Sequence, residues 1–500
     1  MISRAAQFGR AVILAALTTA AAPMASPVLA DDLRGALAAA YQTNPTIEAA
    51  RANQRAVDAG VPIARAAGLP SLAGVGTYSE FLQKSPNSFT SPDRSLDAQA
   101  NLSVPVFSGG AVRNSVRAAE TRVAAGQADL RGTESGLFSQ VVAAYLDVIR
   151  DAAIVGLSRN NVQVLDVNLT ATRDRFEIGD LTRTDVAQSQ ARLAQARADL
   201  RNAEATLAGS RETYIRLVGK PPVDLQPPPP LPNMPATPED AVAIALDSNP
   251  DLIAARQRSK AAGFDTRVAG AGRLPKVSVF SGVDYTDYFN TLGGPAAATF
   301  NQRQTTAQAG VRATIPLFQG GLPAAQERQA QAREGATLEQ EIGTERLVIA
   351  TVRTNFQLWK ASNEIIASSQ SAVDAARLSL EGVRAENSVG NRTILDILNA
   401  EQELLNTQVT LVRARRNSYV AGFSLLSAMG KAEARDLGLD GGILYDPMVN
   451  YQRVRSNIWD WAHDPAPVAQ STRTVDTPAQ TGSVSPSESV ETPAAPQPGK

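Results

Sequence analysis

The stretch FEIGDLTRTDVAQSQ, residues 176–190, returns 211 positions later in altered form as NSVGNRTILDILNAE, residues 387–401. In this alignment Asp185 corresponds to Asp396. Each copy contains a glycine, which can adopt the positive φ that ends a helix, followed by a Thr or Asn side chain that can cap the next helix. The two stretches therefore predict two tight hinges, each between two long helices.

The offset of 211 is kept from Pro105 to Lys220, which pair with Pro316 and Lys431. A register held over so long a stretch is typical of an internal repeat. The chain therefore consists of two copies of one structural unit.

The N-terminal residues 1–30 have the pattern of a secretory signal peptide, with two arginines, an apolar run over 11–22 and small residues up to Ala30. An uncleaved membrane anchor is the alternative, but 12 apolar residues fall short of the about 20 that span a bilayer. We therefore expect an exported chain whose fold begins after residue 30.

The composition excludes several classes of function. The chain has no Cys and one His, His463, so thiol chemistry, disulfides, a His-based triad and a multi-His metal site cannot be built in one chain. A formal net charge of −1 gives no sign of nucleic-acid binding. We expect a protein that is not an enzyme and has no cofactor or metal site.

Long segments without helix breakers predict most of the fold. The run 110–176 reads as one helix of about 100 Å at 1.5 Å per residue, with apolar residues every seven positions as in a coiled coil. The helix after the hinge, 184–217, is half as long, as is the single helix predicted before the strands, 33–68. We expect two half-length helices to stack end to end beside one full-length helix, with a Pro-rich connector at mid-height.

Alternating residues predict strands that span a membrane. Apolar and polar residues alternate over 96–104 and again over 306–315. This length and alternation suit a strand with lipid on one face and water on the other, while an ordinary soluble hairpin is the alternative. Weaker partner strands precede each, at about 71–82 and 277–289.

Four strands cannot close a barrel in a membrane, since single-chain barrels begin at eight strands. An open sheet edge would leave unpaired backbone groups in hydrocarbon. The strands must therefore be shared among copies. Two copies give eight strands with a filled interior and three give twelve with a water-filled one, so the residues favour a channel but leave the number of copies open.

These segments divide the chain into a signal peptide, two repeats joined by a Pro-rich connector, an equatorial segment and a tail. The predicted bounds are 1–30, 31–219 (strands about 71–82 and 95–107, hinge 176–185), 220–238, 239–430 (strands about 277–289 and 304–318, hinge 387–396), 431–463 and 464–500. The tail is rich in Pro, Ser and Thr and poor in large apolar residues, so we expect it to be disordered.

The doubled layout and its motifs resemble the TolC family of outer-membrane channel-tunnels. The motifs are VPVFSGG at 104–110, its counterpart IPLFQGG at 315–321, and the two hinge stretches. The resemblance covers about 31–439. It implies a mainly α fold with membrane β, in which long antiparallel coiled-coil hairpins form an α-barrel and a homotrimer shares a 12-stranded β-barrel.

By the same resemblance the hinges carry a gate at the periplasmic entrance. Arg392 matches the family's gating arginine, and Thr184 and Asp185 match its partners. Asp396 matches one aspartate of a charged ring. The alternative from the residues alone is that Thr184, Asp185, Thr393 and Asp396 only cap helices.

The chain departs from the family pattern at two positions. Asn399 stands where relatives carry a second ring aspartate, and Asn387 where they carry a linking tyrosine. We therefore expect a weaker ring, with one carboxylate per subunit. The turn residues are expected to form the tips that a periplasmic adaptor grips: Gly179, Asp180, Leu181, Gly390 and Asn391.

The function that the resemblance implies is a passive export duct for type I protein secretion or for efflux of small toxic compounds. The implied partners are two further copies, a periplasmic adaptor, an inner-membrane ABC or proton-driven transporter, and outer-membrane lipid. The missing lipid-bearing Cys and the intact VGxRTxxD hinge favour the protein-secretion branch. The alternative is a soluble periplasmic coiled-coil scaffold or adaptor, which would lack membrane strands.

Overall fold

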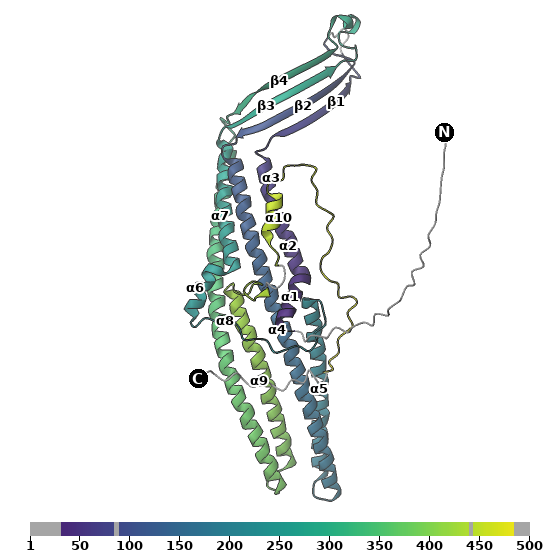
Figure 1. Cartoon of the computed structure of the whole chain (residues 1–500), viewed down its shortest axis with the longest axis vertical. Helices are drawn as coiled ribbons and strands as arrows, with labels where there is room; N and C mark the ends of the chain where they lie inside the picture. Colours follow the sequence, from purple (N-terminus) through teal and green to yellow (C-terminus); the bar gives the residue numbers. More distant parts are fainter. Residues whose placement is uncertain (1–31, 85–89, 440–443, 485–500) are drawn as a thin grey trace, which may run out of the picture.

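The computed structural model describes residues 32–84, 90–439 and 444–484. The predicted signal peptide and the last part of the predicted tail, 485–500, lie outside the described residues. The described chain is elongated, with a four-stranded sheet at one end and long helices running to the other (Figure 1).

The sheet is antiparallel throughout and has the order β1-β2-β3-β4. Its strands are β1 (Ser71–Glu80), β2 (Arg94–Phe107), β3 (Lys276–Asp287) and β4 (Arg303–Thr314). The β2–β3 pairing joins the first repeat to the second, with Ala100 opposite Val283. Within the described chain, no strand lies beside the outer edges of β1 and β4. The predicted set of four strands is therefore confirmed.

Three strands end earlier than predicted, and the first of them, β1, ends at Glu80. β3 stops before Phe289 and Asn290, because these residues have φ of 51° and 62° and leave the extended region. β4 stops before Pro316, which has no N–H to donate to a strand ladder. The connection between β3 and β4 contains a short 3-10 helix, η2 (Gly294–Thr299).

Two long helical hairpins make up most of the chain. α4 (Ala111–Glu177) and α8 (Leu322–Ser388) each contain 67 residues, so each is about 100 Å long at 1.5 Å per residue. They turn back into α5 (Arg183–Val218) and α9 (Ile394–Ala428), which are about half as long and end at mid-height (Figure 1). These proportions are the ones expected from the sequence.

Each repeat also has shorter helices that precede its strands. They are α1 (Leu33–Thr43), α2 (Pro45–Asp58) and α3 (Gly60–Ala66) in the first repeat, and α6 (Pro238–Ser248), α7 (Pro250–Gly270) and the 3-10 helix η1 (Ala271–Arg273) in the second. The prediction of one helix over 33–68 is wrong. Asn44 has a ψ of 127°, because the residue before a proline is driven out of the helical region.

Two buried asparagines determine how the half-length helices stack. Asn44 Oδ1 accepts from the Thr46 N–H and caps α2, while its Nδ2 donates to the Leu217 carbonyl near the end of α5 at 2.9 Å. Asn249 caps α7 in the same way and donates to the Ala428 carbonyl at the end of α9 at 2.8 Å. Thus α2 stands over α5 and α7 over α9. The half-length helices therefore stack end to end as expected, but each stacked pair belongs to one repeat and does not follow the chain through the connector.

The connector 220–238 crosses between these two columns at mid-height. Tyr145, near the middle of α4, donates to the Gln226 carbonyl at 2.6 Å. Tyr419 of α9 donates to the Pro229 carbonyl at 3.0 Å. The connector therefore carries the chain sideways from the end of α5, across α9, to α6 beside α8 (Figure 1).

The segment 431–463 lies at mid-height only in its first part. There the Ala434 N–H donates to Glu134 of α4 at 2.5 Å. The prediction that the whole segment stays at this level is wrong, because α10 (Pro447–Val454) packs higher up, against α2 (Figure 1). The chain therefore rises toward the sheet after it leaves α9.

The first part of the tail, 464–484, differs from the prediction of a disordered segment. It runs back along the molecule and reaches α5, where the Arg211 guanidinium donates to the carbonyls of Thr481 at 2.5 Å and Ser483 at 2.9 Å. Val484 is buried. Backbone carbonyls hold this segment in place, so its shortage of large apolar side chains does not prevent an ordered contact.

The main hydrophobic core lies at mid-height, where the half-length helices meet. Its largest fully buried side chains come from both repeats: Ile47, Phe138, Tyr145, Leu207, Tyr214, Leu252, Leu425 and Leu426. No helix in the described part of the chain combines the length and the apolar character that crossing a bilayer requires.

Candidate functional site

Both hinges end their long helix in the same way. Gly179 has a φ of 81° and Gly390 a φ of 83°, the left-handed conformation that closes a helix C-terminus. The next residue, Asp180 or Asn391, donates its N–H to the carbonyl five residues earlier at 2.9 Å. The predicted role of the two glycines in ending a helix is confirmed.

Thr182 and Thr393 begin the two returning helices. Each hydroxyl accepts from the N–H three residues later at 3.3 Å, and the carboxylate of that residue, Asp185 or Asp396, accepts from the threonine N–H at 2.9 Å. The hydrogen bonds from Thr182 lower the pKa of Asp185, and those from Thr393 lower the pKa of Asp396, so both stay ionised. Thr184, considered as a cap, lies inside α5 and is exposed.

The arginine expected to gate the entrance binds within its own hairpin. Arg392 Nε donates to Glu386 Oε2 of α8 at 2.7 Å, and Asn387 Nδ2 donates to the Arg392 carbonyl at 2.7 Å. The bond with Glu386 raises the pKa of Arg392. No hydrogen bond or ion pair joins Arg392 to Thr184 or Asp185 within the described chain.

The two hairpins of one chain meet near their tips through a different pair. Arg192 Nη2 on α5 donates to Asn399 Oδ1 on α9 at 2.9 Å. Beside it, Leu398 is 2% exposed. This leucine belongs to a small apolar cluster with residues of the first hairpin: Leu165, Leu169, Leu193 and Ala196. Asn399 therefore accepts a hydrogen bond from an arginine on the other hairpin. By the family resemblance, relatives are expected to carry a second ring aspartate at this position.

The predicted tip residues lie at the end of the molecule opposite the sheet (Figure 1). Four of them are exposed and Leu181 is half-buried, the exposed ones being Gly179, Asp180, Gly390 and Asn391. Asp180 accepts from Arg175 Nε at 2.7 Å, so each tip carries one arginine–carboxylate pair. The tips therefore present backbone and paired charges to solvent.

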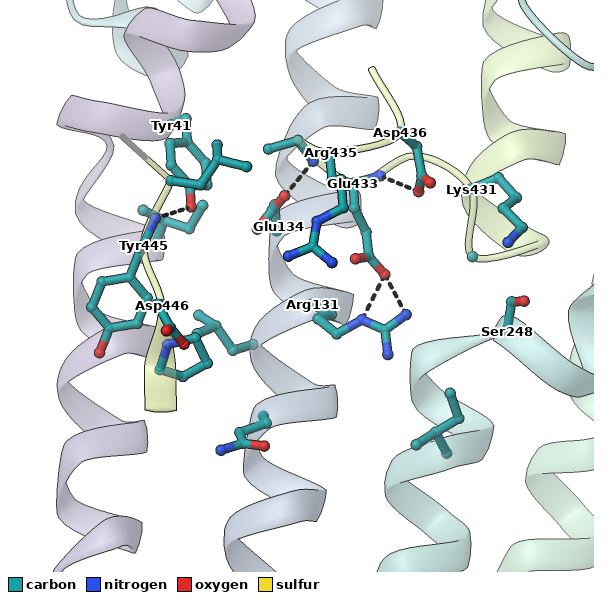
Figure 2. Close-up of a pocket in the computed structure, with 18 of the residues that line it drawn as sticks. Tyr41, Arg131, Glu134, Ser248, Lys431, Glu433, Arg435, Asp436, Tyr445 and Asp446 are labelled. Atoms are coloured by element: carbon teal, nitrogen blue, oxygen red, sulfur yellow. Dashed lines mark hydrogen bonds and ion pairs between the residues drawn. The ribbon is translucent and has the colours of Figure 1, made fainter. Parts of the chain in front are cut away.

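A second polar site lies at mid-height (Figure 2). A cavity of about 580 Å³ opens between α1, α2, α4 and the segment after α9. Arg131 Nε donates to Glu433 Oε1 at 2.7 Å on one wall. On the other, the Arg51 guanidinium lies 4.5 Å from the Tyr41 ring centre and 4.9 Å from that of Tyr445, whose N–H donates to the Tyr41 hydroxyl at 3.0 Å. These contacts tie the segment after α9 to three helices of the first repeat.

Glu134 faces this cavity from α4 (Figure 2). Burial raises the pKa of its carboxyl to about 7, and the nearby Glu433 carboxylate adds to the rise, while the hydrogen bond from Ala434 and the charges of Arg51 and Arg131 oppose it. Glu134 therefore changes its charge near neutral pH. Across the described residues, no group of three or more His, Asp or Glu side chains is placed to hold a metal ion.

Sequence reasoning missed four residues of the hinge site: Thr182, Glu386, Arg192 and Leu398. Thr182 had a signal, because the repeat offset of 211 aligns it with Thr393. The others had none, since a surface Glu or Arg, or a Leu in a helical seam, resembles many others in the chain.

The repeats correspond to a known family. The model of the family described as outer membrane efflux protein matches residues 36–220 and 241–431. The chain belongs to the outer membrane efflux protein family. Each of the two matched stretches coincides with one of the repeats that the offset of 211 had defined.

Several relatives of this efflux-family chain are similar over most of their length. It is 34% identical over 428 residues to outer membrane efflux protein BepC of Brucella suis biovar 1 (strain 1330), covering 85% of this chain and 91% of that protein. It is 27% identical over 361 residues to outer membrane protein TolC of Escherichia coli (strain K12), covering 67% and 71%. It is also 27% identical over 316 residues to the alkaline protease secretion protein AprF of Pseudomonas aeruginosa, covering 62% and 64%.

Solved structures share the fold. The outer membrane protein VceC of Vibrio cholerae superposes with a TM-score of 0.69 at 23% identity, covering 80% of this chain and 96% of that one. CusC superposes with a TM-score of 0.70 at 19% identity, covering 80% and 92%. The helical hairpins and four-stranded sheet therefore form the architecture of these channel proteins.

Family membership gives the cellular location and the general function of the chain. It is an outer-membrane channel-tunnel protein and a component of an efflux or secretion system. The alternative of a soluble periplasmic scaffold or adaptor has no support among these relatives.

Proposed function

We propose that three copies of this efflux-family chain form one passive export duct. Their sheets close a 12-stranded β-barrel in the outer membrane, and their hairpins form a helical barrel in the periplasm. The observation that carries this proposal is the pair of open sheet edges on β1 and β4. Such edges need backbone partners in lipid, and pairing β4 of one copy with β1 of the next closes twelve strands around a water-filled interior.

Exposed apolar side chains on α8 support the same assembly. Several large ones face solvent in the single chain: Leu338, Ile342, Leu347, Leu358, Ile365 and Leu378. A helix that leaves so many apolar side chains in water normally packs against another surface. A neighbouring copy would cover them.

The hinges form the gate of this duct. Arg392 of one copy exchanges its bond with Glu386 for Thr184 and Asp185 of the next copy, which closes the entrance. Asp185 suits this role because its pKa is lowered, so it offers a carboxylate to which a guanidinium can donate two hydrogen bonds. Opening then requires breaking one such link per copy.

The entrance ring is weaker than in relatives with two aspartates per subunit. Asp396 contributes one carboxylate per copy, whereas Asn399 contributes none and accepts from Arg192 instead. Asn387 holds the backbone of Arg392 in place of a linking tyrosine. Cations should therefore bind weakly at this entrance.

The duct has no catalytic chemistry of its own and works with two partners. A periplasmic adaptor binds the exposed tips, and an inner-membrane ABC or proton-driven transporter supplies the energy. The tip residues concerned are Gly179, Asp180, Leu181, Gly390 and Asn391. Proteins and small toxic compounds are both candidate cargoes, since the relatives include an efflux protein and a protease secretion protein.

The assembly is tested by the mass of the mature protein after detergent extraction of outer membranes, with and without heating. We expect three chains that separate on heating. A monomer or dimer that stays in solution without detergent would refute the shared barrel.

The gate is tested by single-channel conductance in planar bilayers. Arg392→Ala should raise the conductance, because the link between copies is lost. The matched control is Arg175→Ala, which breaks the corresponding ion pair with Asp180 at the other tip and should leave the conductance unchanged. An unchanged conductance in Arg392→Ala would remove this residue from the gate.

A further inference from the structure

The loop Arg455–His463, which follows α10, exposes large apolar side chains to solvent. Ile458, Trp459 and Trp461 are 71%, 69% and 80% exposed. Two of the three tryptophans in the chain therefore lie in one exposed loop. Side chains of this size rarely gather in water without a binding partner.

The loop is held in a defined shape. At its base, the Arg453 guanidinium donates to both carboxylate oxygens of Asp464, at 2.6 and 2.9 Å. At its apex, the Trp459 N–H donates to Asn457 Oδ1 at 3.0 Å, and the Ala462 N–H donates to the Trp459 carbonyl at 3.1 Å. A loop that is already ordered loses little conformational freedom when it binds.

The loop lies at the base of the sheet. Arg65 Nη1 of α3 donates to the Arg455 carbonyl at 2.8 Å. β1 begins at Ser71, so at most about 20 Å of extended chain separates Arg65 from the first strand. Figure 1 shows the segment after α10 passing beside α3, just below the sheet.

We propose that this loop is an interfacial anchor that places Trp459 and Trp461 in the headgroup layer of the periplasm-facing leaflet of the outer membrane. The inference rests on the proposed function, in which the four strands span that membrane. The base of the sheet then marks the membrane surface, where tryptophan is favoured because its ring can contact acyl chains while its N–H stays among polar groups.

Two further observations favour lipid as the partner. Arg65 and Arg455 lie at the same level and bring guanidinium groups to which lipid phosphates bind well. The exposed apolar surface of the loop is also followed by exposed apolar residues in the sheet, where Leu72 of β1 is 74% exposed. The loop is thus continuous with a surface that faces the membrane in the proposed barrel.

Quenching of tryptophan fluorescence tests the anchor in the assembled protein. The Trp359→Phe variant leaves only the two loop tryptophans as emitters, since the chain has three. The matched control, Trp459→Phe with Trp461→Phe, leaves only Trp359, which lies midway along α8 with its ring centre 6.0 Å from that of Phe356. Both variants are reconstituted into phospholipid vesicles whose acyl chains carry bromine near the headgroup, and into unbrominated vesicles.

We expect the emission of Trp359→Phe to fall in the brominated vesicles and that of the control variant to stay unchanged. If bromine does not reduce the emission, the anchor is refuted. If that unquenched emission is also blue-shifted, the two indole rings are buried against a neighbouring copy and not in lipid. Conductance of the same vesicles separates the two proposals. Conducting vesicles without quenching would refute the anchor alone. Quenching without conductance, in vesicles whose protein also carries Arg392→Ala so that the proposed gate stays open, would support the anchor and refute the duct.

Discussion

Replacing Glu134 by Gln should stabilise, at neutral pH, the contact between α4 and the segment after α9. It should also make the stability of this contact depend less on pH. Burial raises the pKa of this carboxyl from its ordinary 4.5 to about 7, so the folded chain keeps a proton that the unfolded chain releases. Unfolding then releases a proton between these two pH values, and stability falls as the pH rises through this window. The stabilising contribution is complete below about pH 4.5 and lost above about pH 7.

The size of the effect follows from the same pKa values. A tenfold change in proton affinity corresponds to about 1.36 kcal/mol, so the rise from 4.5 to about 7 sets an upper limit of about 3 kcal/mol per chain. Glu134 is only partly shielded from water, which reduces the expected effect to about 1–2 kcal/mol. Gln keeps an oxygen that accepts from the Ala434 N–H but never becomes charged. The variant should therefore gain this amount above pH 7 and little near pH 4.5.

Hydrogen exchange of the Ala434 amide measures this contact, because its N–H is bonded to Glu134. Protection is compared at both ends of the pH window after correction for the intrinsic exchange rate. The comparison variant is Glu433→Gln, which removes a charge that raises the pKa of Glu134, so its protection should fall less steeply with rising pH than that of the wild type. Equal loss of protection with rising pH in the wild type and in Glu134→Gln would refute the reasoning.

Two other substitutions test how the helices begin and join. Thr182→Ala removes the cap of α5 at a cost of about 1 kcal/mol, so amides in the first turn should exchange about fivefold faster, while Thr184→Ala should change nothing. Similar exchange in both variants would contradict the assigned cap. Asn44→Asp keeps the cap oxygen but puts a second oxygen against the Leu217 carbonyl, which should cost about 1–3 kcal/mol and lower the temperature of heat unfolding. A variant as heat-stable as the wild type would show that this joint adds nothing.

The sequence alone could predict the elements of the fold because its signals are local and occur twice. Gly179 and Gly390 need a positive φ, and no other residue type adopts it so readily, so the helix ends could be located closely. Strict alternation over 96–104 could only be a strand. Within the two repeats, most elements could also be checked against their counterpart in the other copy.

The contacts between distant elements could not be predicted in this way. Asn44 precedes a proline and is recognisable as a break, but its partner Leu217 lies 173 positions further along the chain. Arg392 has several carboxylates within reach, and no periodicity indicates that Glu386 is the one it binds in a single chain. The tail is held by backbone carbonyls, which composition does not reveal.

The two asparagine joints also indicate where this channel can move. Each joint needs an oxygen that accepts from a helix N-terminus and an N–H that donates to a helix C-terminus, and the Asn amide supplies both. Each joint stacks two half-length helices of one repeat, while α4 of the first repeat also packs against α7 and α9 of the second, and the main core binds the repeats together at mid-height. Below that level the hairpins of one chain share the small cluster around Leu398 and the Arg192–Asn399 bond. Because few contacts join the tips, we expect the opening motion of the proposed gate to stay within the lower hairpins and to leave the sheet undisturbed.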